Sequence, residues 1–99
     1  MKISSQTFRN MDIRLDFGDF ENCNFEDCKM VYGGYGPVRM VGNTFIKVSW
    51  FFADAAQNTI GFLTVMYHGA GDGGRKLVES TFENIKAGKY IAGAKELSR

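Results

Sequence analysis

A five-residue period runs through residues 13–52 and constrains the fold more than any other feature of the sequence. In each block of five, counted from Ile13, the first residue is mostly small or apolar, the second is mostly polar, and the third is large and apolar. The third-position residues are Leu15, Phe20, Phe25, Met30, Tyr35, Met40, Phe45 and Trp50. A simple β-strand alternates with a period of two and an α-helix with a period of 3.6, so neither explains the pattern. The period instead predicts a coil whose first and third block positions point inward.

This pattern resembles that of the pentapeptide-repeat proteins, in which four blocks make one turn of a square right-handed β-helix. The resemblance covers residues 13–52 and implies about two coils of a short right-handed parallel β-helix. The family's usual alanine is absent from the first position, and leucine occupies the third position only at Leu15. Residues 33–37 (GGYGP) are a candidate to bulge out of the coil as a loop. A triangular β-helix with irregular turns is the nearest alternative.

Four blocks per turn imply that residues twenty apart stack on one another. The implied pairs are Leu15 on Tyr35, Phe20 on Met40, Phe25 on Phe45, Met30 on Trp50, Cys23 under Asn43, and Cys28 under Val48. An inward Asn43 is expected to hydrogen-bond the backbone of a turn, because a buried amide left unpaired costs about 1–3 kcal/mol.

Most outward positions are polar, but one face carries Val31 and Tyr32 above Phe51 and Phe52. Four large apolar side chains on one side of a small protein are not expected to remain in water. Either the following helix folds back over them, or they form a dimer or partner interface, where buried aromatic residues dominate the binding energy. A short β-helix also exposes open edges that a second copy could cover.

The remaining segments flank this core within a single domain, because 99 residues are too few to bury a second core. Residues 1–12 do not fit the grid and are expected to cap the first coil, as an irregular segment or a short strand. Asp54 and Gln57 have the spacing of a capping box, and apolar residues recur at helical spacing after them, which predicts a helix over 54–68. A glycine-rich loop at 69–74, a second amphipathic helix at 75–87 and a tail at 88–99 follow. An alternative interpretation makes residues 80–84 (STFEN) a further five-residue block.

The layout NxFxxxxWxF, followed by NTxGFL and YHG, is similar to a group of short bacterial proteins of unknown function. The similarity covers residues 43–50 with Phe52, then 58–63 and 67–69. It indicates a natural domain and implies no chemistry.

The glycine-rich segment GAGDGG is a candidate ligand site. Gly69, Gly71 and Gly74 match GxGxxG, and their amides at a helix N-terminus, with Arg75 and Lys76 beside them, could hold a phosphate or nucleotide. The dinucleotide-binding motif should follow a strand, however, and here the segment follows a predicted helix. A flexible helix–helix hairpin is the competing interpretation.

Cys23, Cys28 and His68 provide three of the four ligands that a structural zinc site needs, at a spacing unlike CxxC. A cysteine–histidine nucleophile would need a partly exposed thiol, whereas the period places both cysteines inward. Buried, reduced thiols in a cytoplasmic protein are the preferred interpretation, with a disulfide or metal pair as the alternative. We expect no catalytic residues, no metal and no cofactor.

The net charge of +1 gives no global field that would recruit nucleic acid or an acidic membrane. No stretch approaches the roughly 18 apolar residues of a membrane helix, and the first ten residues have no apolar run typical of a secretory signal. An acidic segment contains Asp19, Glu21, Glu26 and Asp27. Some pentapeptide-repeat proteins mimic DNA and bind topoisomerases through an acidic surface, so the resemblance makes DNA mimicry one hypothesis, and a solvated surface is the other.

The sequence therefore favours a small, non-enzymatic, cytoplasmic interaction or scaffold protein that forms a homodimer or binds a protein partner. Its candidate interface is Val31, Tyr32, Phe51 and Phe52. Binding or catalysis at the 69–74 loop and acidic DNA mimicry remain alternative hypotheses.

Overall fold

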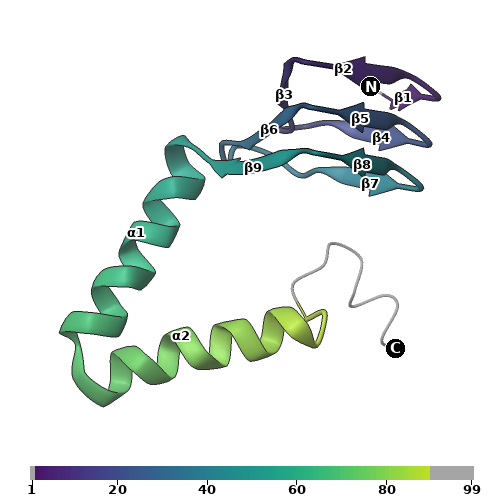
Figure 1. The fold of residues 1–99 in the computed structure, drawn as a ribbon. Helices are drawn as coiled ribbons and strands as arrows, with labels where there is room; N and C mark the ends of the chain where they lie inside the picture. Colours follow the sequence, from purple (N-terminus) through teal and green to yellow (C-terminus); the bar gives the residue numbers. More distant parts are fainter. Residues whose placement is uncertain (1, 90–99) are drawn as a thin grey trace. The chain divides into compact units, whose positions relative to one another are not determined.

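The computed structural model describes residues 2–89, which form nine short strands followed by two helices (Figure 1). The strands are β1 (Lys2–Ser4), β2 (Thr7–Arg9), β3 (Asp12–Arg14), β4 (Asp19–Glu21), β5 (Asn24–Glu26), β6 (Lys29–Tyr32), β7 (Arg39–Val41), β8 (Thr44–Ile46) and β9 (Ser49–Phe52). The helices are α1 (Asp54–Gly69) and α2 (Gly71–Lys86). The chain divides into two compact units, one that ends at Asn58 and one that begins at Thr59.

The strands form three parallel sheets, in the orders β1-β4-β7, β2-β5-β8 and β3-β6-β9. Every third strand pairs, so the chain visits the three sheets in turn and then begins a new layer (Figure 1). We call each layer of three consecutive strands a coil. A segment without strand structure closes the first coil at residues 15–18 and the second at residues 33–38. The predicted combination of a β-helix-like parallel arrangement with two helices is therefore present.

The five-residue period arises from three strand residues and two corner residues. One corner residue in each turn has a positive φ, as at Asn22 (56°), Asp27 (53°) and Gly42 (70°). Glycine, asparagine and aspartate tolerate this left-handed region better than other residues do. The other corner residue points inward, as Cys23 and Cys28 do, with exposures of 0% and 3%. Each sharp corner thus turns the chain from one sheet into the next.

The register confirms the predicted stacking between the second and third coils. Phe20 pairs with Met40, Phe25 with Phe45, and Met30 with Trp50. Asn43 also behaves as predicted: its Oδ1 accepts a hydrogen bond from the Cys23 amide at 2.8 Å, and its Nδ2 donates to the Phe20 carbonyl at 3.1 Å.

The first coil differs from the prediction. Residues 1–12 were expected to cover the first coil as an irregular cap or a short strand. They instead contain β1 and β2, which belong to the first coil itself and pair with β4 and β5 in full register. Ile3 pairs with Phe20, a separation of 17 residues rather than twenty, because the turn at residues 15–18 is two residues shorter than the turn at 33–38 and β3 is one residue shorter than β6. The predicted stacking of Leu15 on Tyr35 is wrong, since Leu15 is buried in this short turn and Tyr35 is 58% exposed.

The core of the first unit lies mainly in the middle coil, with Ile13 and Leu15 added from the first coil and its closing turn. Its buried residues are Ile13, Leu15, Phe20, Cys23, Phe25, Cys28 and Met30. Phe25 stacks between Phe8 and Phe45, with ring centroids 5.3 and 5.5 Å away and interplanar angles of 11° and 8°. These three rings form an aromatic ladder with one rung in each coil.

Helix α1 begins at the predicted residue, and α2 begins earlier than predicted. Four of the six residues expected in a 69–74 loop lie in the first turn of α2, so only Ala70 separates the helices. Gly74 explains this arrangement, because a Cβ at this position would collide with the Met66 carbonyl of α1. The helix also includes residues 80–84, which excludes a further five-residue block there. Of the predicted 88–99 tail, residues 90–99 lie outside the described part of the chain.

Candidate interaction surface

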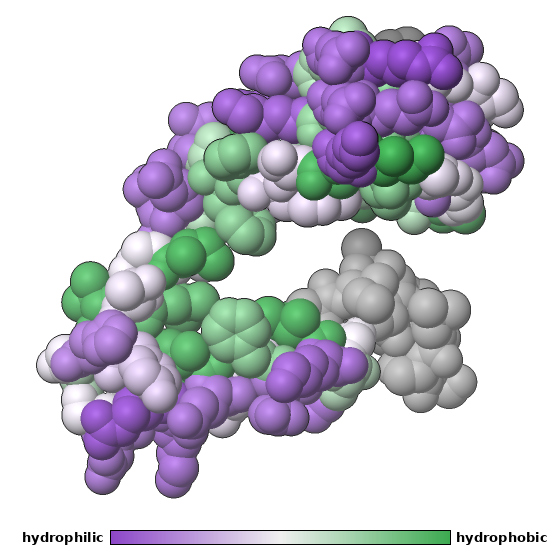
Figure 2. All heavy atoms as spheres, in the orientation of Figure 1, coloured by the Kyte–Doolittle hydropathy of each residue, from purple (hydrophilic) through white to green (hydrophobic). Residues whose placement is uncertain are grey.

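The last coil, formed by β7, β8 and β9, is one end of the strand stack. Within residues 2–89, no strand pairs with the outer edge of β7, β8 or β9. Figure 2 shows apolar residues gathered along this layer, whereas the coils above it are mostly polar. The exposed large side chains of this coil are Val41, Phe45, Ile46, Trp50, Phe51 and Phe52, and we call them the open end.

The inward residues show how much of the core the open end leaves exposed. Phe25 and Met30 of the middle coil are 0% exposed, whereas their neighbours Phe45 and Trp50 in the last coil are 39% and 53% exposed. The chemical character of these positions is the same in both coils. Their exposures differ because no further coil follows the last one among the described residues. The open end therefore has the composition of a core.

Three outward residues of the last coil, Val41, Ile46 and Phe51, are also apolar. Val41 and Ile46 pair with Glu21 and Glu26 of the middle coil, and Phe51 pairs with Val31. Glu21 and Glu26 in turn form ion pairs with the first coil. The ion pairs that Glu21 and Glu26 make with the first coil therefore have no counterpart at Val41 and Ile46 of the last coil.

Val31, Tyr32, Phe51 and Phe52, the interface predicted from the sequence, meet in one sheet. Val31 pairs with Phe51 and Tyr32 with Phe52, on β6 and β9. Val31 and Tyr32 are half-buried, and Tyr32 packs against the core, whereas Phe51 and Phe52 are 46% and 57% exposed. The Lys29 ammonium lies 4.6 Å from the centre of the Phe51 ring. The exposed part of the predicted face is therefore its β9 half, which continues into the open end.

Sequence reasoning missed Val41, Phe45 and Trp50 as surface residues. Phe45 and Trp50 occupy third block positions, which elsewhere in the repeat point into the core. The available signal was the end of the repeat at residue 52, because the last coil of any such stack has one uncovered side.

Three acidic residues of the middle coil, Asp19, Glu21 and Glu26, are paired with basic residues. Lys2 lies 3.0 Å from Glu21, Arg9 lies 3.0 Å from Glu26, and Arg39 contacts both Asp19 at 2.7 Å and Glu21 at 3.4 Å. The hydrogen bond from Lys2 is the main reason that the pKa of Glu21 lies below its usual value. These contacts join neighbouring coils, so the charges of Asp19, Glu21 and Glu26, part of the acidic surface expected of a DNA mimic, are largely neutralised on β4 and β5.

A second charge network ties the start of α1 to the strand stack. The Asp16 carboxylate accepts hydrogen bonds from the backbone amides of Gly33 and Tyr35, both at 2.8 Å, and pairs with Arg14 at 3.0 Å. Arg14 also donates to Asp54 at 2.7 Å. Burial raises the pKa of Asp16, but the two amides and Arg14 outweigh burial and hold the pKa below its usual value. Each group in this network has a partner, which indicates a structural role beside the end of β9.

One glycine of the 69–74 segment lies at the contact between the two helices. Gly69, Gly71 and Gly73 face open space, whereas Gly74 lies against the Met66 carbonyl. Arg75 pairs with Asp72 within the first turn of α2, and Lys76 is exposed. Because residues 71–74 are helical, their amides do not form the loop that the phosphate-binding hypothesis requires.

The cysteines are buried and unpaired with each other. The Cys23 thiol donates to the Ile3 carbonyl and the Cys28 thiol to the Phe8 carbonyl, each at 3.4 Å. His68 is exposed beside Tyr67. The described part of the chain contains no cluster of three or more histidine, cysteine, aspartate or glutamate residues that could hold a metal ion.

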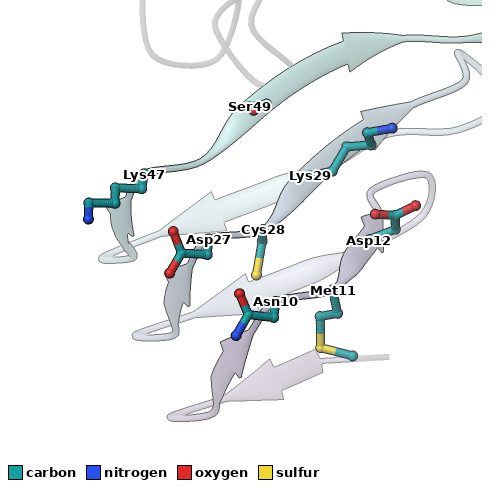
Figure 3. A pocket seen from close by; sticks show the side chains of 8 residues that line it. All are labelled: Asn10, Met11, Asp12, Asp27, Cys28, Lys29, Lys47 and Ser49. Carbon is teal, nitrogen blue, oxygen red and sulfur yellow. The ribbon is translucent and has the colours of Figure 1, made fainter.

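A shallow groove of about 390 Å³ follows the corner between the second and third strands of each coil (Figure 3). It is lined by Asn10, Met11, Asp12, Asp27, Cys28, Lys29, Lys47 and Ser49. Acidic and basic side chains alternate along it, and the only thiol is buried. The groove therefore presents neither a uniform charge for a ligand nor an accessible thiol nucleophile.

No family model, curated protein or solved structure matches this chain. Neither α1 nor α2 is long and apolar enough to cross a membrane.

Proposed function

We propose that this protein is a small non-enzymatic interaction domain of the cytoplasm, which self-associates as a homodimer through the open end. The observation that carries the proposal is the 39–57% exposure of the six open-end side chains. Two of them, Phe45 and Trp50, occupy the same inward positions of the coil as the buried Phe25 and Met30. A surface with the composition of a core is expected to be covered in solution.

We also propose that the coils wind as a short right-handed parallel β-helix of the pentapeptide-repeat type. Connections between parallel strands of one sheet are right-handed in nearly all known cases, which supports this hand. The five-residue step and the inward corner residues support the relation to pentapeptide repeats.

The size of the open end supports a dimer that dissociates at accessible dilutions. Full burial of one large apolar side chain contributes about 1.5–3 kcal/mol, so covering a side chain that is already half-buried contributes roughly 1 kcal/mol. Six such side chains on each of two copies give a total of about 12 kcal/mol. Association itself costs roughly 4–15 kcal/mol, so the net affinity is expected to be moderate.

The alternative functions have weaker support. The phosphate-binding hypothesis relies on a loop at residues 69–74, most of which is helical. The DNA-mimic hypothesis relies on Asp19, Glu21, Glu26 and Asp27, and the first three of these pair with basic side chains. No observation at either location favours a ligand over the structural role.

The proposal is tested by light scattering after size exclusion, over a dilution series from high to low micromolar concentration. We expect a dimer that dissociates on dilution, and a monomer at all concentrations for the double variant Phe51→Asp with Phe52→Asp. Phe17→Asp is the matched control, because Phe17 is 65% exposed but lies in the 15–18 turn, which closes the first coil and is not part of the open end. A wild-type monomer throughout the series, or a double variant with unchanged mass, would contradict the proposal.

A further inference from the structure

The two ends of the strand stack carry like charges at an aligned position, Lys2 in the first coil and Arg39 in the last, which limits how copies can join. Aligned positions alternate in sign through the coils, as in Lys2, Asp19 and Arg39. If the first coil of one copy stacked on the last coil of another in this same register, Lys2 would lie opposite Arg39, and Arg9 opposite Ile46. Like charges directly opposite one another across paired strands are destabilising. A head-to-tail filament is therefore disfavoured, although the strand directions would permit it.

Joining two last coils avoids this repulsion. A two-fold axis perpendicular to the stack reverses the strand direction, so edges that meet across it pair antiparallel. The faces of each coil follow the order of β7, β8, β9 and the strandless side, which places β8 opposite the turn of residues 33–38. An axis through the β8 face pairs β8 with its own copy and β7 with β9 of the second copy. All three free edges are then used, whereas an axis through β7 and β9 would set β8 against the turn that contains Pro37.

We propose that two copies join tail to tail in this way, with a two-fold axis through the β8 face and β8 paired antiparallel with β8 of the second copy. This inference depends on the proposed self-association. It specifies that the partner is a second copy of this chain and how the two copies are arranged.

The side chains fit this arrangement. Phe45 is the central residue of β8 and meets its own copy at the axis, so the ladder of Phe8, Phe25 and Phe45 continues into the second copy. Met40 lies opposite Trp50 of the second copy. Arg39 lies opposite Phe51 of the second copy, where a guanidinium over an aromatic ring is favourable. The apolar positions of the last coil thus meet residues with which they are compatible.

Paired cysteine substitutions test the geometry in the full chain. An antiparallel β8 pair centred on Phe45 places Thr44 of one copy opposite Ile46 of the other, at the Cα separation of about 4.5–5.5 Å typical of such pairs. A disulfide spans this distance. The variants Thr44→Cys and Ile46→Cys are co-produced with different tags and oxidised with diamide. Native Cys23 and Cys28, at 0% and 3% exposure, are shielded from the reagent.

We expect a disulfide dimer carrying both tags from the mixture, and little cross-linking from either variant alone. Val41→Cys with Ser49→Cys tests the β7–β9 pairing in the same manner, and circular dichroism of each reduced variant verifies folding. The control mixture, Thr7→Cys with Thr44→Cys, cross-links only in a head-to-tail stack. Cross-linking of the control, or a dimer in which neither tail-to-tail pair cross-links, overturns this inference and leaves the proposed self-association standing. A monomer in light scattering overturns both.

Discussion

Replacing Phe25 by alanine removes the central rung of the aromatic ladder. The ring is 0% exposed, stacks between Phe8 and Phe45, and meets the edge of Phe20 at 5.5 Å. Deleting a buried phenylalanine side chain in this way costs about 3–5 kcal/mol, because the transfer free energy is lost and a cavity remains. The first unit ends at Asn58. At roughly 0.05–0.15 kcal/mol per residue, a unit of this size has about 3–9 kcal/mol of stability in total. We therefore expect Phe25→Ala to remove most of the stability of this unit.

Phe45→Ala is the matched control, because it removes the same side chain from the next rung of the ladder. Phe45 is 39% exposed, so about three-fifths of the cost at Phe25 applies, roughly 2–3 kcal/mol. Urea unfolding, followed by far-ultraviolet circular dichroism and by the fluorescence of the single tryptophan, measures both variants. These measurements are made at a concentration where the protein is monomeric. Equal losses for the two variants, or a larger loss for Phe45→Ala, would refute the assignment of Phe25 to the core and Phe45 to the open end.

Two further changes test the charge network and the helix crossing. Because the pKa of Asp16 is below its usual value in the folded protein, its contribution to stability is complete above the ordinary aspartate value of about 4 and is lost as the pH falls through the lower folded value. Thermal melts between pH 7 and pH 2 should therefore show a smaller acid-induced loss for Asp16→Asn than for the wild type, and parallel curves would contradict this role. Gly74→Ala should destabilise the α1–α2 hairpin in circular dichroism melts, because a Cβ has no room against α1. Gly73→Ala, which faces open space in the same turn, should be neutral or stabilising by up to about 1 kcal/mol, and similar melts for both variants would disprove a close helix crossing at Gly74.

The five-residue period was sufficient to predict the pairs of the second and third coils. Phe20 with Met40 and Phe25 with Phe45 follow from counting twenty residues, because the corners between their strands are regular. The same count does not predict the pairs of the first coil, because the short turn at residues 15–18 shifts Ile3 away from the twenty-residue spacing. A periodic pattern predicts strands that share one spacing, and it loses the register wherever a turn changes length.

The glycine-rich segment shows a different limit of sequence reasoning. Four glycines in six residues predict a loop, since glycine is a poor helix former. In the structure, Gly74 instead allows α2 to approach the Met66 carbonyl of α1. Local propensity alone does not reveal such a contact between helices.

The open end could be predicted only in part, because Phe45 and Phe25 are the same residue at equivalent positions of the repeat. Their difference in exposure depends on what lies next along the stack, and a second copy would remove that difference. Dimerisation then stabilises the folded state by mass action, so the unfolding midpoint of the wild type should rise with protein concentration. The cost of Phe45→Ala should rise with it, toward the cost of Phe25→Ala, because the ring becomes buried in the dimer. The cost of Phe25→Ala should change less, because the Phe25 ring is already fully buried in one copy. If the two costs keep a constant difference from low to high micromolar concentration while light scattering shows a dimer, the dimer interface does not include Phe45.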